Sequence, residues 1–197
     1  MGIMSVKKII IFLLVIGVMA VVTGCSRWPD GPNGNGGTEN YQLEITVEVL
    51  GEINTDDGIY YIVLDADGEL ETWPGEDIEG WEEDFYYVRL NEWGFYFAQV
   101  EEGSSGISLT SSLIGEKSFQ VTIDLNDLEV PGNSDFNINI NVITTDLYKH
   151  TYDSLDGGFS INTYLGSKPP RIDLEGDSGE DGPNFDIIRV RAEIKTL

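Results

Sequence analysis

Aromatic and acidic side chains gather in one long polar stretch, residues 66–84. Trp73 and Trp81 lie there among many glutamates and aspartates. Tryptophan rings stack on the apolar faces of sugar rings, and carboxylates accept hydrogen bonds from hydroxyls, so this stretch suits carbohydrate binding. Trp93, in a later turn, could join the same stacking surface. The alternative, which we favour because large aromatics usually serve packing, is that Trp73 and Trp81 fold back as lids over the open end of the core.

A second acidic segment, Asp173–Gly182, places carboxylates at alternate positions among glycines. Calcium takes six to eight oxygen ligands, and a glycine-rich loop of this kind can wrap one ion. The shorter segment Asp65–Glu69 is a second candidate, and neither segment matches the EF-hand pattern. The alternative is a solvated acidic turn in a chain that is acidic throughout. We expect the protein to require no cofactor. If calcium binds, its candidate ligands are Asp173, Glu175, Asp177 and Asp181.

The residues that usually carry catalysis are scarce in this chain. His150 is its single histidine, and no G-x-S-x-G motif marks an activated serine. One histidine and one cysteine also rule out a two-histidine or thiolate zinc site within the chain. We therefore expect His150 to be a surface residue at a strand end, and we expect the protein not to be an enzyme.

The charge of the chain restricts its partners. The two lysines of the N-terminal segment are among 11 basic residues, so the chain after Cys25 carries nine basic and 35 acidic residues, a formal net charge of −26. Such a surface repels phosphate backbones, and the closest basic patch, Arg189 with Arg191, is too small to bind nucleic acid. The acid excess is compatible with a salty environment, with cation binding or with a basic partner.

Apolar residues alternate with polar ones along most of the chain, which predicts strands with one buried face. The first such strand has Leu43, Ile45, Val47 and Val49 on its apolar face. A turn cluster at 54–58 and a more fully apolar run, Ile59–Asp65, follow, and this pair suggests a hairpin. A second hairpin is expected from Phe85–Leu90 and Phe95–Glu101. The last strand, Phe185–Lys195, is expected to bury Ile188, Val190, Ala192 and Ile194.

Eight or nine such strands predict an all-β fold, a single antiparallel β-sandwich of jelly-roll or immunoglobulin-like type. A closed barrel is the alternative. The only segment with room for a helical turn after the N-terminal segment is Ser108–Ile114. Another strand alternates Asn137, Asn139 and Asn141 with apolar residues. Those asparagines suit the polar outer face of an edge or surface strand, although a sugar-binding or ice-like lattice is the alternative.

The chain begins with Lys7 and Lys8, the apolar run Ile9–Val22, and the tetrapeptide Val22-Thr23-Gly24-Cys25. A basic region, a short apolar region and small residues before a cleavage point are the features of a secretory signal peptide. The run is shorter than the roughly 20 apolar residues of a bilayer-spanning helix, which favours a cleaved signal peptide. The alternative is that the segment stays uncleaved as a membrane anchor. The segment resembles the signal peptide of bacterial lipoproteins, and its tetrapeptide resembles their lipobox. That resemblance implies cleavage after Gly24 and lipidation of Cys25.

Three parts of the chain follow from this interpretation: a signal peptide over 1–24, the lipidated Cys25 with a Gly/Pro/Asn-rich tether over 25–40, and an acidic domain over 41–197. The segments Tyr60–Asp65, Trp73–Gly75 and Phe85–Arg89 resemble bacterial lipoproteins of unknown function. This resemblance implies a secreted sandwich domain and brings no catalytic residues.

The sequence thus predicts a lipid-anchored protein of the cell envelope that acts by binding or as a scaffold. Its partners would be the membrane, through the lipid on Cys25, and an envelope protein or a polysaccharide. Its location would be the outer membrane where a cell has two membranes, and the outer face of the cell membrane otherwise. The alternative is a carbohydrate-binding module that uses its exposed tryptophans and is stabilised by calcium.

Overall fold

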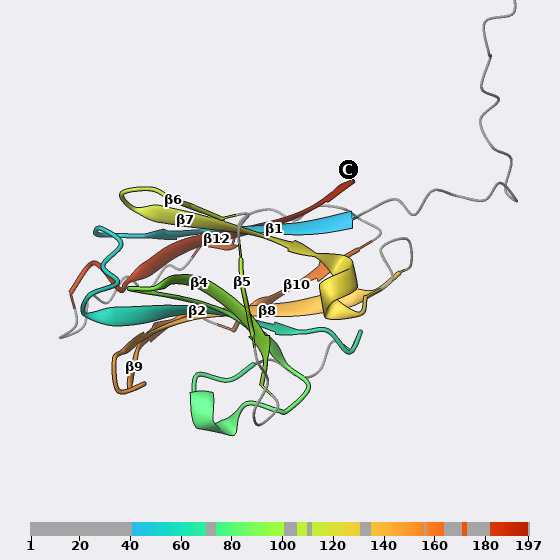
Figure 1. The fold of residues 1–197 in the computed structure, drawn as a ribbon, viewed down its shortest axis with the longest axis horizontal. Helices are drawn as coiled ribbons and strands as arrows, with labels where there is room; N and C mark the ends of the chain where they lie inside the picture. Colours follow the sequence, from blue (N-terminus) through green and yellow to red (C-terminus); the bar gives the residue numbers. More distant parts are fainter. Residues whose placement is uncertain are drawn as a thin grey trace, which may run out of the picture. The chain divides into compact units, whose positions relative to one another are not determined.

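The computed structural model describes residues 41–69, 74–100, 106–109, 112–130, 135–155, 157–163, 171–172 and 182–196. Over these residues nearly all regular structure is β-strand, arranged as two antiparallel sheets packed face to face (Figure 1). The all-β sandwich predicted from the sequence is therefore confirmed. Cys25 and the tether to Asn40 lie outside the described residues.

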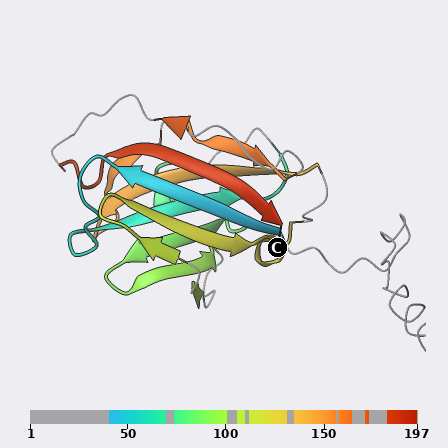
Figure 2. The same ribbon diagram turned by 90° about the horizontal axis from the view of Figure 1, so that it is seen from above.

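The first sheet, called sheet A, contains the chain's first and last strands side by side (Figure 2). Its strand order is β11-β12-β1-β7-β6. The strand bounds are Arg171–Ile172 (β11), Ile187–Thr196 (β12), Tyr41–Val49 (β1), Ser118–Asp124 (β7) and Ser112–Ile114 (β6).

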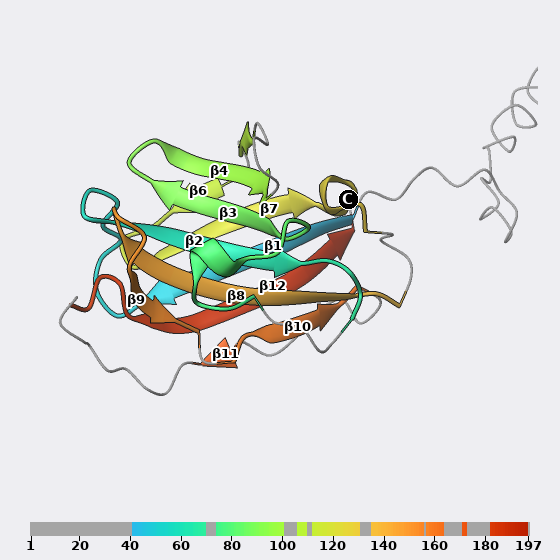
Figure 3. The same cartoon turned by 90° about the horizontal axis from the view of Figure 1, so that it is seen from below.

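The second sheet, called sheet B, has the order β10-β8-β2-β3-β4-β5, and β9 pairs with β8 beside it (Figure 3). The strand bounds are Phe159–Asn162 (β10), Asn137–Asp146 (β8), Gly58–Asp65 (β2), Tyr86–Asn91 (β3), Gly94–Gln99 (β4), Ile107–Ser108 (β5) and Thr151–Ser154 (β9). The predicted hairpin around residues 91–94 is confirmed as β3 and β4.

Two short 3-10 helices complete the described structure, η1 (Ile78–Gly80) and η2 (Leu125–Leu128). Each begins at an aspartate, Asp77 or Asp124, whose carboxylate accepts a hydrogen bond from the backbone N–H two residues later. The helical turn expected at Ser108–Ile114 is wrong for the described ends of that segment, which form β5 and β6.

The main core lies between the sheets, where the alternating apolar residues of both meet. Leu43, Ile45, Val47 and Val49 of β1 are all fully buried there, as predicted from their spacing. A smaller apolar cluster lies on the opposite, outer face of sheet B, and it contains Tyr61, Val63, Trp81, Phe85 and Ile143. Sheet B is thus apolar on both faces over part of its area, which requires a cover on its outer side.

The first predicted hairpin is wrong, because β1 and β2 belong to different sheets. β1 pairs with β7 and β12, whereas β2 pairs with β3 and β8. The intervening residues 50–57 cross from one sheet to the other instead of forming a tight turn between neighbours. This segment is longer than the two- to five-residue connection typical of a hairpin.

The last strand also differs from its prediction at one position. Val49 is opposite Ile187, and Glu48 is opposite Arg189, so Ile188 is an extra residue in a β-bulge. Ile187 is consequently fully buried, while Ile188 is only partly buried. Strict alternation predicted that Ile188 would be buried and Ile187 would not. That prediction is wrong because the bulge shifts the inward and outward positions of the strand by one residue.

Candidate ligand-binding site

The three tryptophans proposed as a stacking surface have different surroundings. Trp73 lies outside the described residues. Trp81 is only 8% exposed, whereas Trp93, at the tip of the β3–β4 hairpin, is 85% exposed. The Trp81 ring packs edge-on against Tyr61 at 5.5 Å between centroids and lies 6.1 Å from Tyr87. Its indole N–H donates to the Gly75 carbonyl at 2.8 Å, so Trp81 is a packing residue, but it packs on the outer face of sheet B and not over the open end of the core.

Asparagines of β8 hold the long loop after β2 against the outer face of sheet B. Asn139 donates to the Glu69 carbonyl at 2.7 Å, and Asn141 donates to the Pro74 carbonyl at 2.7 Å. Both asparagines are buried, and β8 is an internal strand between β10 and β2. The expectation of an edge or surface strand with a solvated asparagine face is therefore wrong. The Asn141 amide satisfies the carbonyl of buried Pro74, which burial would otherwise leave unpaired.

The loop carries η1 over the outer face of sheet B (Figure 3). Trp81, which follows η1, belongs to the apolar cluster on that face, with Tyr61 of β2. There, the strand register aligns three large side chains across neighbouring strands. Tyr61 of β2 is opposite Arg89 of β3, and Arg89 is opposite Tyr96 of β4. Directly opposite residues have Cβ atoms roughly 5 Å apart, so the Arg89 side chain leaves its strand between two aromatic residues. Its Cζ atom is 5.0 Å from the centre of the Tyr96 ring.

A pocket of about 180 Å³ lies between this row and the loop. Aromatic rings form one part of its wall, and two cations, Arg89 and Lys149, form another. The residues that line it are Tyr61, Ile78, Trp81, Tyr87, Arg89, Val100 and Lys149. Concave sites with apolar walls and a few convergent polar groups are the usual form of a small-molecule site.

Arg89 and Lys149 differ from the cations of sheet A in their partners. Among the described residues, neither forms an ion pair with a carboxylate. Moreover, Arg89 Nε is buried and has no hydrogen-bond partner in the described part of the chain. Three cations of sheet A do form ion pairs, namely Arg189 with Glu48, Arg191 with Glu193 and Lys195 with Glu44. In a protein this acidic, two cations that line one pocket without carboxylate partners have the charge that suits an anionic ligand.

The tyrosine hydroxyls of the pocket remain protonated at neutral pH. Burial raises the pKa of Tyr61 above its ordinary value, although the nearby Arg89 opposes that shift. Burial likewise raises the pKa of Tyr87, again against the influence of Arg89. A protonated phenol can donate a hydrogen bond as well as accept one, so Tyr61 and Tyr87 can both donate to a ligand oxygen.

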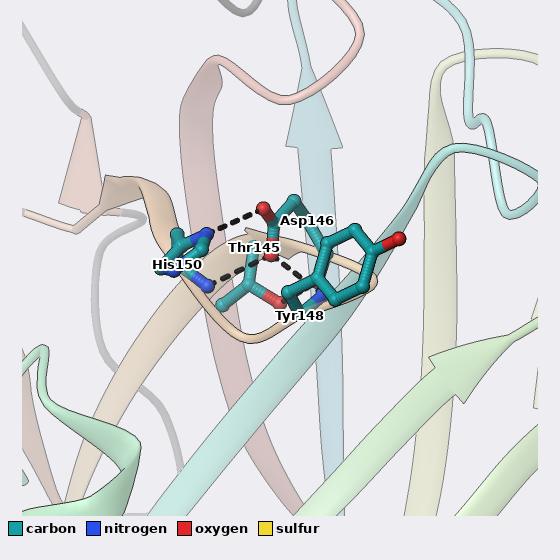
Figure 4. Close-up of polar contacts among 4 residues, drawn as sticks. All are labelled: Thr145, Asp146, Tyr148 and His150. Carbon is teal, nitrogen blue, oxygen red and sulfur yellow. Dashed lines mark hydrogen bonds and ion pairs between the residues drawn. The ribbon is translucent and has the colours of Figure 1, made fainter.

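The β8–β9 turn holds Lys149 at the pocket wall. The Asp146 carboxylate accepts the backbone N–H groups of Tyr148 and His150 at 2.7 and 2.8 Å, and it contacts the His150 imidazole at 2.7 Å (Figure 4). Lys149 between them has a φ of 71°, a left-handed conformation that is uncommon for a lysine. Partial desolvation raises the pKa of Asp146, but the hydrogen bonds from His150 and Tyr148 outweigh it and lower the pKa below its ordinary value.

His150 is at the exposed tip of this turn, as expected from the sequence, with its side chain 80% accessible. Its imidazole Nδ1 contacts Asp146, and that carboxylate is already engaged by two backbone amides. The pair therefore orders the turn that carries Lys149.

The candidate calcium ligands Asp173, Glu175, Asp177 and Asp181 all lie outside the described residues. In the shorter acidic segment, the Asp65 carboxylate accepts the Asp67 N–H at 3.2 Å, and the Asp67 carboxylate accepts the Glu69 N–H at 2.7 Å. These oxygens stabilise the turn. Within the described residues, no group of three or more histidine, cysteine, aspartate or glutamate side chains is arranged to hold a metal ion.

No sequence motif marked Arg89, Tyr61 or Lys149 as site residues. One signal was present: Arg89 stands at a polar position of the predicted strand Phe85–Leu90, two residues from Tyr87, in a chain with few cations. Alternation places Arg89 and Tyr87 on the same face. What alternation could not supply was the partner strand or the loop that closes the pocket.

Similarity to known proteins does not assign a function to this chain, so the function is inferred from the geometry of the pocket. No family model matches the chain, and neither a curated protein nor a solved structure matches it. Among the described residues there is no helix with the length and apolar character needed to cross a membrane.

Proposed function

We propose that this chain is a lipid-anchored, extracytoplasmic binding protein without catalytic activity, and that it binds its ligand in the pocket of sheet B. The pocket is the observation that carries this proposal. It joins the rings of Tyr61, Trp81 and Tyr87 to the cations Arg89 and Lys149. The lipobox-like tetrapeptide ending at Cys25 supports the anchor and the extracytoplasmic location.

The aromatic wall favours a ligand that contains a ring. Rings prefer edge-to-face or offset contacts with aromatic side chains, and Tyr61, Trp81 and Tyr87 already surround the pocket with mutual distances of 5.5 to 6.2 Å. This supports a saccharide or another small ring compound. It moves the carbohydrate-binding hypothesis from a row of exposed tryptophans to a pocket in which Trp81 is one wall.

A thermal-shift screen with saccharides and small ring compounds tests the proposal. A ligand that binds only the folded state raises the melting temperature. The matched variant is Val100→Trp, which fills the pocket without changing a charge. We expect at least one compound to stabilise the natural protein and to lose this effect in Val100→Trp. Equal stabilisation of both proteins, or none by any compound, would contradict the proposal.

A further inference from the structure

We infer that the ligand of the sheet B pocket is a six-membered ring bearing one carboxylate, and that Arg89 and Lys149 hold that carboxylate. This inference rests on the proposed function and specifies its ligand. Four properties of the pocket support it: its volume, the buried Arg89 Nε that has no hydrogen-bond partner among the described residues, the neutral tyrosines that line it and the acidic surface around it.

The volume of the pocket suits a single ring. A protein cavity of about 150 Å³ accepts a molecule the size of benzene. The sheet B pocket has about 180 Å³, which leaves room for a six-membered ring with a small substituent. Trp81 and Tyr87 both line the pocket, and aromatic side chains favour contact with a ring.

The guanidinium of Arg89 supplies the anion contact. Its Nε is buried without a partner among the described residues, and a buried donor in this state is costly until an acceptor reaches it. Arginine presents N–H groups in a planar fork that matches the two oxygens of a carboxylate. Tyr61 and Tyr96 flank Arg89 across the strands, which restricts where that fork can point.

Lys149 adds a second positive charge from a different element, the β8–β9 turn. The protonated hydroxyls of Tyr61 and Tyr87 add no negative charge to the pocket. A ligand carboxylate would therefore have cations and hydrogen-bond donors as its neighbours.

The surface around the pocket favours a single negative charge over several. The loop that carries Trp81 exposes acidic residues on both sides of it, namely Glu76, Asp77, Glu79, Glu82, Glu83 and Asp84. These side chains repel an extended polyanion or a dianionic phosphate more strongly than a monoanion. A monocarboxylate places its one charge at the two cations and leaves the remainder neutral.

Two natural sources share this chemistry, a sugar acid and an aromatic acid, and calorimetry can separate them. We would titrate the full-length protein in detergent with glucuronate and with benzoate, and with their neutral counterparts glucose and benzamide. We expect at least one of the two carboxylates to bind. Its neutral counterpart should bind with an affinity about tenfold or more lower, because it lacks the charge-assisted hydrogen bonds to the cations. Glucuronate alone would indicate a sugar acid, and benzoate alone an aromatic acid.

Variants assign the effect to the pocket. Arg89→Gln should weaken carboxylate binding by about tenfold or more, and Arg89→Lys should keep part of it, because the charge stays while the fork is lost. The matched control is Arg191→Gln, a strand arginine of sheet A, with unchanged affinity. Lys149→Gln, in an exposed turn, gives a second test in case Arg89→Gln does not fold, and should also weaken binding.

Three outcomes overturn the inference. The first is binding of glucose or benzamide as tightly as their acids, which leaves the pocket as a ring site and the proposed function intact. The second is equal affinity in Arg89→Gln, Lys149→Gln and Arg191→Gln. The third is absence of binding by both acids. If the thermal-shift screen also finds no pocket ligand, the proposed function fails with it.

Discussion

Replacing Trp81 by alanine should destabilise the protein by about 3–5 kcal/mol. Trp81 is 8% exposed and contacts Tyr61 and Tyr87. A buried tryptophan removes roughly 200 Å² from water, which at about 25 cal/mol per Å² corresponds to about 5 kcal/mol. That figure is an upper value, since the unfolded chain already hides part of this surface and alanine keeps the Cβ. Mutations of buried tryptophan to alanine fall in the same range.

Urea denaturation followed by circular dichroism measures this change as a shift of the midpoint at constant slope. Trp93→Ala is the matched control, because Trp93 is 85% exposed and its loss should change stability by less than about 0.5 kcal/mol. Trp81→Phe should cost about 1–2 kcal/mol, because the ring contacts remain while the indole hydrogen bond to Gly75 is lost. If Trp81→Ala lowers the free energy of unfolding no more than Trp93→Ala does, Trp81 does not stabilise the fold by packing.

Three further variants test the burial of Tyr60, the hydrogen bond of Asn141 to the loop and the lipid anchor at Cys25. Burial raises the pKa of Tyr60 to about 12, so the folded state keeps a proton that the unfolded chain releases near pH 10. Stability should therefore fall by roughly 1–3 kcal/mol between pH 10 and 12, and Tyr60→Phe should flatten this fall in alkaline denaturation curves. Asn141→Ala leaves the Pro74 carbonyl unpaired and should lower the free energy of unfolding by about 1–3 kcal/mol. Amide hydrogen exchange in residues 74–84 should become faster, and unchanged exchange there would contradict the attachment of this segment by Asn141. Cys25→Ala should move the protein from the membrane fraction to the soluble fraction on cell fractionation, and retention in the membrane would contradict lipid anchoring.

Local alternation was enough to predict most strands and their buried faces. Leu43, Ile45, Val47 and Val49 of β1 and Phe119, Val121 and Ile123 of β7 are buried as their period-two spacing indicates. This success has a physical reason, because successive side chains of a strand point to opposite faces whatever the partner strand is.

Features that depend on distant parts of the chain could not be predicted in this way. The pairing of β1 with β12 and the bulge at Ile188 arise from contacts between the two ends of the domain. Asn139 and Asn141 were expected to face water because nothing in their own strand shows that Glu69 and Pro74, from the segment after β2, accept hydrogen bonds from them. The pocket depends on the same segment, since Trp81 comes from that loop while Arg89 comes from β3.

Nuclear magnetic resonance of the protein with a carboxylated ring ligand shows directly whether the ligand binds on the outer face of sheet B, against Arg89. We expect a large shift of the Arg89 Nε–H signal, together with nuclear Overhauser effects from the ligand ring to the Trp81 and Tyr87 rings. Effects to the exposed Trp93 or Tyr148 rings instead, with the Arg89 signal unmoved, would contradict binding at this site.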